Sequence, residues 1–143
     1  MRVVLDTSVL IAALRSPKGA AAEILRHVLA GKITILMDAK LSYEYEAVAL
    51  RTQHLHATGR SRTETVTFLE TLYDLAEPVF VTYRYRPLSP DSDDDMLLEL
   101  AINGQAEALV SFNIKHFQEP LRAFGIETYR PGELLKKLSS RRK

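Results

Sequence analysis

Short apolar runs alternate with longer helical segments along the whole of this 143-residue chain. The runs are rich in β-branched and other apolar residues, which is typical of strands buried on both faces of a sheet. They lie at residues 3–5, 33–37, 79–83, 108–112 and 126–129. Strands that alternate with helices pair in parallel and carry helices on both faces. The sequence therefore predicts an α/β fold, a three-layer α/β/α sandwich with a mostly parallel central sheet of about five strands.

Composition predicts one globular domain over residues 1–138, followed by a disordered basic tail at 139–143. The chain has no cysteine, which excludes disulfides and thiolate metal sites and favours a reducing, cytoplasmic location. No apolar run is long enough to span a membrane, so no membrane association is expected. The net charge of +1 does not by itself indicate a nucleic-acid partner.

The first predicted strand ends abruptly at Asp6, which is followed by the hydroxyl residues Thr7 and Ser8. In an open α/β sheet, ligands bind at the carboxyl ends of the strands. Asp6 is therefore a candidate site residue. It is equally consistent with a simple N-cap of the apolar helix that follows.

A second acid, Glu44, lies in a predicted helix that runs from residue 39 to about residue 54. At 100° per residue, Glu44 lies about 60° from Leu41 and about 40° from Val48, at the edge of the apolar face. Glu46 lies about 140° from Leu41 and points to solvent. A carboxylate at the rim of a buried face is unfavourable unless something neutralises it, so Glu44 is a candidate and Glu46 is not.

A third group of acids crowds the start of a predicted helix that is apolar nearly all round. The group comprises Asp91, Asp93, Asp94 and Asp95. Acids complement a helix N-terminus, and one can cap it, but four so close together repel one another and favour a bound cation. Asp95 immediately precedes the apolar turn, so its side chain is predicted to point inward. Asn113, just past the fourth strand, offers an amide oxygen at a corresponding edge, although alone it also fits a turn.

Clustered carboxylates without cysteine favour hard divalent ions, Mg²⁺ or Mn²⁺. Ions bound in this way usually act on phosphate esters, because they activate a water molecule and stabilise charge on the attacked phosphate. The sequence thus predicts a metal site formed by Asp6, Glu44 and Asp95.

Four motifs in order resemble the PIN domain, a nuclease domain of toxin–antitoxin toxins and RNA-processing factors. They are Leu5-Asp-Thr-Ser-Val-Leu10, Glu44 within Leu41-Ser-Tyr-Glu-Tyr-Glu-Ala-Val48, Asp91-Ser-Asp-Asp-Asp-Met96 and Ala108-Leu-Val-Ser-Phe-Asn-Ile-Lys-His-Phe117. The resemblance implies a Mg²⁺- or Mn²⁺-dependent endoribonuclease, with an antitoxin partner and a homodimeric assembly. Asp6, Glu44, Asp95 and Asn113 are the implied catalytic residues, supported by Ser8, Asp93, Asp94 and Ser111. Asn113 departs from the family, where Asp is frequent, and this leaves three carboxylates.

Cations must surround such a site if it binds RNA, since the carboxylates repel a polyanion. The candidate RNA-binding residues are Arg51, Arg60, Arg62, Arg84, Arg86 and Lys115. Charge clusters of this kind are also common on solvated surfaces, and both interpretations stay open.

Two other functions remain as alternatives. An aspartyl phosphatase would use Asp6 as a covalent nucleophile, but such enzymes normally carry a second Asp two residues later, where this chain has Ser8. A catalytically weak or inactive PIN-fold module that binds RNA or a protein partner is compatible with Asn113. Metal-dependent cleavage distinguishes the nuclease from this module.

Overall fold

The structure is a computed structural model that describes residues 1–84 and 92–141, with only the backbone described at 92 and 93. No helix in this part of the chain is long and apolar enough to cross a membrane. In chain order the elements are β1 (Arg2–Leu5), α1 (Thr7–Arg15), α2 (Ala20–Leu29), β2 (Thr34–Met37), α3 (Ala39–Ala49), α4 (Thr52–Thr58), α5 (Arg62–Leu75), β3 (Glu77–Pro78), α6 (Ser92–Asn103), β4 (Ala108–Val110), α7 (Ile114–Arg122), β5 (Glu127–Tyr129) and α8 (Pro131–Arg141).

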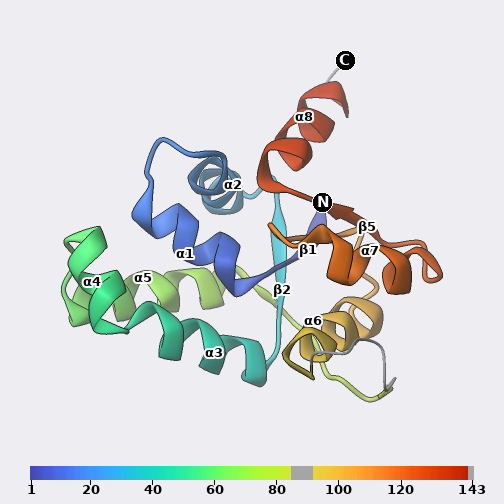
Figure 1. The fold of residues 1–143 in the computed structure, drawn as a ribbon, viewed down its shortest axis with the longest axis horizontal. Helices are drawn as coiled ribbons and strands as arrows, with labels where there is room; N and C mark the ends of the chain where they lie inside the picture. The colour runs from blue at the N-terminus through green and yellow to red at the C-terminus, as the bar shows by residue number, and fades with distance from the viewer. Residues whose placement is uncertain (85–91, 142–143) are drawn as a thin grey trace.

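The five strands form one parallel sheet in the order β3-β2-β1-β4-β5. The chain builds outward from β1 through β2 to β3, and α6 then carries it back across the sheet to β4. Crossovers between parallel strands are right-handed, so this reversal places α1–α5 on one face and α6 and α7 on the other. Figure 1 shows these two groups of helices on opposite sides of the strands. The predicted three-layer α/β/α fold is confirmed.

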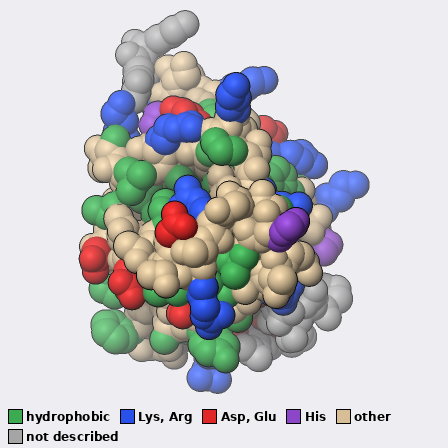
Figure 2. All heavy atoms as spheres, turned by 90° about the vertical axis from the view of Figure 1, so that its left-hand side faces the viewer, with side chains coloured by type: hydrophobic (Ala, Val, Ile, Leu, Met, Phe, Trp, Pro, Cys, Tyr) green, Lys and Arg blue, Asp and Glu red, His purple; other side chains and the backbone are tan. Residues whose placement is uncertain are grey.

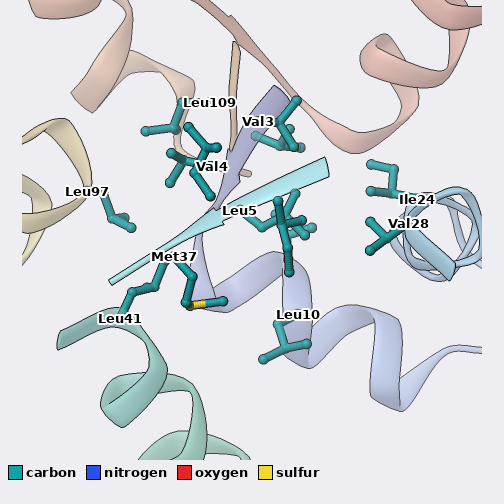
Figure 3. Close-up of a cluster of buried hydrophobic side chains, with 14 of the residues drawn as sticks. Val3, Val4, Leu5, Leu10, Ile24, Val28, Met37, Leu41, Leu97 and Leu109 are labelled. Carbon is teal, nitrogen blue, oxygen red and sulfur yellow. The ribbon is translucent and has the colours of Figure 1, made fainter. Parts of the chain in front are cut away.

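The core is centred on β1, whose Val3, Val4 and Leu5 are at most 1% exposed. Figure 3 shows these side chains packed between residues of α1 and α2 and residues of the neighbouring strands and α6. The apolar pattern of α6 predicted a buried helix, and Leu98 and Leu100 are fully buried in it. The sequence therefore predicted correctly that this strand and this helix are buried.

One long helix predicted from residue 39 to about residue 54 is in fact two helices. α3 ends at Ala49, and the extended backbone of Arg51 (φ −61°, ψ 138°) begins α4. α4 continues to Thr58 and ends at Gly59 in the left-handed conformation, so helix extends about four residues beyond the predicted end. No proline or glycine marks the break at Arg51, and local sequence gave no signal for it.

The third strand is also displaced from its predicted position at 79–83. β3 comprises Glu77 and Pro78, which pair with Leu36 and Met37 of β2. One further bond, from Val79 N–H to Met37 O at 2.8 Å, ends the pairing. The strand stops there because β2 ends at Met37 and the chain turns into α3, which leaves 79–83 without a neighbouring strand.

Three of the remaining helices, α5, α7 and α8, can be compared with the sequence. α5 begins with a capping box between Ser61 and Glu64, for which the spacing Ser-Arg-Thr-Glu is the sequence signature. α7 was not predicted. α8 continues through Arg141, beyond the predicted end at Leu138 and into the segment expected to be a disordered tail.

Candidate active site

The candidate site lies where the strand order reverses, between β1 and β4. In open α/β sheets this switch point leaves a crevice outside the carboxyl ends of the strands, where ligands bind. Asp6 follows β1 directly, and its backbone N–H donates to Val110 O of β4 at 2.9 Å. Ser111 and Asn113 follow β4. The topology thus brings together two segments that lie more than one hundred residues apart in the sequence.

Asp6 occupies the N-cap position of α1, but its side chain makes no capping hydrogen bond. Instead, Ser111 Oγ donates to Asp6 Oδ2 at 2.7 Å, and the backbone N–H of Asn113 donates to Ser111 Oγ at 2.9 Å. Asp38, at the end of β2, behaves differently: its Oδ1 accepts from Leu41 N–H at 2.8 Å and caps α3. The interpretation of Asp6 as a simple N-cap is therefore wrong, and Asp38 shows what such a cap looks like in this protein.

Glu44 lies half-buried in the middle of α3, whereas Glu46 is exposed, as the helical spacing predicts. Thr7 Oγ1 donates to Glu44 Oε2 at 2.6 Å, which connects α3 to the first residue of α1. Among the described residues, no Lys or Arg forms an ion pair with Glu44, so its charge is not balanced by a basic side chain there.

Tyr45, next to Glu44, anchors α3 to the central strand. Its hydroxyl donates to Leu5 O, and its side chain is 1% exposed. Burial raises the pKa of Tyr45 well above its usual value, and the charge of nearby Asp6 raises it further. Sequence analysis missed these roles of Thr7 and Tyr45, although each stands beside a predicted site residue.

Asp95 lies in the first turn of α6 and is 5% exposed. Its Oδ1 is buried and has no hydrogen-bond partner. α6 packs against β1, α3 and α7, the elements next to which Asp6, Glu44 and Asn113 stand. A buried carboxylate oxygen without a partner is unfavourable, and among the described residues Asp95 Oδ1 is the only fully buried carboxylate oxygen that lacks one.

The other predicted site residues are distributed around these carboxylates. Asp94 is paired with His116 Nδ1 at 2.8 Å, which joins the starts of α6 and α7. Asn113 occupies the N-cap position of α7 with an exposed side chain that makes no capping bond. Ser111 is fully buried and Ser8 is exposed. The side chain of Asp93 lies outside the described residues, as does Asp91.

A divalent cation fits this region by donor chemistry. Carboxylate oxygens are the ligands that Mg²⁺ and Mn²⁺ prefer, and the orphaned Asp95 Oδ1 is a buried oxygen that a cation would satisfy. Within the described part of the chain, no three His, Asp or Glu side chains stand close enough together to form a complete metal site.

Those predicted RNA-binding cations that fall within the described residues are exposed and are spread over several elements. Arg51, Arg60 and Arg62 surround α4 and the start of α5, and Arg60 lies over the Phe68 ring at 5.3 Å. Figure 2 shows basic side chains interspersed with hydrophobic and acidic ones on the face of α1–α5. Arg84 follows β3, Lys115 lies in the first turn of α7, and Arg86 falls outside the described residues.

Comparison with known proteins identifies the family. A chain of VapBC2 from Rickettsia felis, in a crystal structure bound to a DNA fragment from their promoter, has a similar fold. The similarity has a TM-score of 0.63 at 19% sequence identity and covers 90% of this chain and 98% of that chain. No curated protein matches the chain significantly in sequence. The family model of the PIN domain matches residues 2–115, a span that contains Asp6, Glu44, Asp95 and Asn113. The chain therefore belongs to the PIN domain family.

Proposed function

We propose that this protein is a metal-dependent endoribonuclease that hydrolyses phosphodiester bonds of RNA, of the toxin type found in toxin–antitoxin pairs. The PIN domain assignment and the fold shared with a VapBC2 chain support this class of nuclease. The observation that carries the proposal is the position of Asp6 and the orientation of its carboxylate. Asp6 stands at the switch point of the sheet, and its carboxylate is oriented by Ser111 instead of capping its own helix.

Three carboxylate oxygens support a divalent ion at this place. Ser111 and Thr7 each donate to one oxygen of Asp6 and Glu44, and no described residue donates to the other oxygens, Asp6 Oδ1 and Glu44 Oε1. The buried Asp95 Oδ1 also lacks a partner. We assign Asp6, Glu44 and Asp95 as the residues that would hold Mg²⁺ or Mn²⁺. Their side chains do not stand close enough together in the structure to form a complete site, so binding of the ion would have to draw them closer. When bound, such an ion lowers the pKa of a water ligand and stabilises negative charge on the attacked phosphate.

The rest of the site orients these carboxylates. The relay from Asn113 N–H through Ser111 Oγ to Asp6 Oδ2 holds the Asp6 carboxyl group in one orientation. The neutral, exposed side chain of Asn113 offers an amide oxygen without adding a fourth negative charge beside the polyanionic substrate.

Cleavage of a labelled single-stranded RNA tests the proposal. We expect cleavage by the wild-type protein with Mn²⁺ or Mg²⁺ and none with EDTA. Asp95→Asn should abolish cleavage while leaving stability unchanged or slightly raised, because it removes a buried charge without a partner. Asp6→Asn should also abolish cleavage.

Glu46→Gln is the matched control, since Glu46 lies on the same helix as Glu44 but is exposed. It should cleave as the wild type does. Full activity of Asp95→Asn would remove Asp95 from the site. A wild-type protein that binds RNA but never cleaves it with any divalent ion would support the inactive PIN-fold module instead.

We also propose an antitoxin protein as a partner and the reducing cytoplasm as the location. The similar VapBC2 chain comes from a structure of VapBC2 bound to promoter DNA, and this supports an antitoxin partner. A chain without cysteine suits a reducing compartment. Expression of the wild-type protein alone should arrest growth of the host, and co-expression of the small protein encoded beside it should relieve the arrest.

A further inference from the structure

The segment at residues 79–84 follows β3 along the edge of the sheet and exposes aromatic side chains. Phe80 is 85% exposed, more than any other large hydrophobic residue in the described part of the chain, and Tyr83 is 54% exposed. Exposed aromatic rings on irregular backbone are a common feature of surfaces that bind a partner.

The segment is nevertheless held firmly against α6. Asn103 Oδ1 accepts hydrogen bonds from the backbone N–H groups of Thr82 at 3.1 Å and Tyr83 at 2.8 Å. Its Nδ2 donates to Tyr83 O at 2.7 Å and to Glu99 O at 2.8 Å. One side chain thus fixes the backbone that carries Phe80, so the exposed ring is pre-organised.

Phe80 stands between two surface pockets and lines both of them. The first, of about 390 Å³, is also lined by Asp38, Lys40, Arg84 and Glu99. The second, of about 400 Å³, is more apolar and includes Tyr73. Both volumes fall within the roughly 300–1,000 Å³ typical of small-molecule sites, which is enough room for a nucleobase beside the ring.

The first pocket adjoins the proposed catalytic carboxylates through α6. Asp95 and Glu99 are four residues apart on that helix, so they share one face with a rise of about 6 Å between them. Met96, directly after Asp95, lines the pocket. A strand bound at the carboxylates would therefore pass beside Phe80.

We propose that Phe80, together with Lys40 and Arg84, forms a base-stacking subsite for single-stranded RNA beside the catalytic carboxylates. This proposal rests on the proposed ribonuclease function. Lys40 and Arg84 form no ion pair with any described residue, and they supply the positive charge that backbone phosphates need. The Asp38 carboxylate in the pocket lining repels phosphate, so the pocket itself takes the base, whose N–H groups can donate hydrogen bonds to a carboxylate.

Binding measurements with two RNA probes test the subsite. The first probe is a fluorescent oligoadenylate of about ten nucleotides, and the second is an abasic ribose-phosphate strand of the same length. Dissociation constants are measured in EDTA, so that neither probe is cleaved. Phe80→Ala should weaken binding of oligoadenylate roughly 5- to 150-fold, as expected for loss of one stacked base, and should leave the abasic strand unchanged.

Three further variants sharpen the test. Phe80→Trp should bind oligoadenylate at least as well as the wild type, because it keeps a stacking surface. Arg84→Ala should weaken both probes equally and reduce the salt dependence by about 0.7 in slope, the contribution of one phosphate contact. Phe124→Ala removes an exposed aromatic residue near the start of β5, away from the carboxyl ends of the strands, and should change neither affinity.

Equal affinity of Phe80→Ala and the wild type for oligoadenylate would overturn the subsite, as would equal weakening of both probes. Loss of antitoxin binding by Phe80→Ala without any loss of RNA affinity would also overturn it, and would assign the surface to a protein.

Cleavage by the wild type is measured separately. If the wild type cleaves RNA while Phe80→Ala binds normally, the subsite fails and the function stands. If Phe80→Ala loses affinity for oligoadenylate alone and the wild type does not cleave RNA, the proposed function fails and the subsite stands.

Discussion

At the scale of single residues, three polar side chains at strand ends have similar local sequence contexts but form different hydrogen bonds. Asp38 caps α3, whereas Asp6 and Asn113 occupy N-cap positions and make no capping bond. For Asp6 the difference comes from Ser111, whose Oγ donates to the Asp6 carboxylate and accepts from the backbone N–H of Asn113. A neighbouring strand, and not the helix that follows, decides what Asp6 does.

Ser111→Ala should reduce RNA cleavage by a factor of about ten or more while changing the affinity for RNA little. The variant removes the donor to Asp6 Oδ2, so the carboxylate loses its fixed orientation. The loss of one intramolecular hydrogen bond should lower the free energy of unfolding by about 1 kcal/mol. Cleavage rates and urea denaturation measure the two effects. Ser8→Ala, an exposed hydroxyl at the same edge, should leave both unchanged.

Glu44→Gln tests the metal ligands without any measurement of activity. Mn²⁺ at a hundredfold excess over its Kd stabilises the native state by about 2.7 kcal/mol. For a domain of this size, that corresponds to a rise in Tm of roughly 5–11 °C. In Glu44→Gln the metal-free protein should be as stable as the wild type or more so, and the rise in Tm with Mn²⁺ should shrink.

Melting curves with and without Mn²⁺ decide the role of Glu44, with Glu46→Gln as the control. A variant that is destabilised equally in both conditions would indicate a structural role, through the bond to Thr7. A rise in Tm that Glu44→Gln leaves unchanged would remove Glu44 from the metal site.

At the scale of elements, two tyrosines hold α3 in place. Tyr45 bonds to Leu5 O of β1, and Tyr73 of α5 donates to Ser42 O of α3 at 2.9 Å. Burial raises the pKa of Tyr73 to about 12, with a further contribution from the charge of Glu46, and burial also raises the pKa of Tyr45. The helix that carries Glu44 is thus positioned by two neutral hydroxyls.

These shifts predict a loss of stability in alkaline solution. In the unfolded chain a tyrosine ionises near pH 10, whereas the folded pKa values of Tyr45 and Tyr73 are higher. Because the native state binds these protons more tightly, their contribution to stability is complete below pH 10 and falls as the pH rises toward 12. Urea midpoints measured across this range should fall less steeply for Tyr45→Phe than for the wild type. Tyr43→Phe, at an exposed position, should show the wild-type slope.

At the scale of the whole molecule, an apolar surface remains on the face of α1, α2 and α5. A hollow there is lined by Leu14, Leu25, Leu29 and Phe68 among others, and Leu29 is 49% exposed. Figure 2 shows hydrophobic side chains on this side of the protein. We predict that the protein is a homodimer in solution and that this surface takes part in its interface.

Sedimentation velocity at micromolar concentration should show a dimer for the wild type and a monomer for Leu29→Glu, since the introduced charge would be buried in the interface. Phe124→Glu, which places a charge on an exposed residue beyond α7, should remain dimeric. A wild-type protein that is monomeric at every concentration would contradict the prediction.

The order of strands and helices could be predicted from the sequence, because strands buried on both faces leave a local mark. Residues 3–5 of β1 are apolar, as are residues 96–102 of α6 apart from Glu99, and each element was recognised from that pattern alone. The acids at the end of β1 and at the start of α6 were visible for the same reason, since each follows or precedes an apolar run. The capping box of α5 is likewise a contact between residues three apart.

Only the tertiary structure decided how these elements meet. β3 stops at Pro78 because its partner β2 has already turned into α3, and the break at Arg51 has no local signal. The bonds from Ser111 to Asp6 and from Thr7 to Glu44 join residues 105 and 37 positions apart. Local sequence encodes propensity and burial, but which oxygen receives which hydrogen bond depends on the crossover that returns the chain from β3 to β4 beside β1.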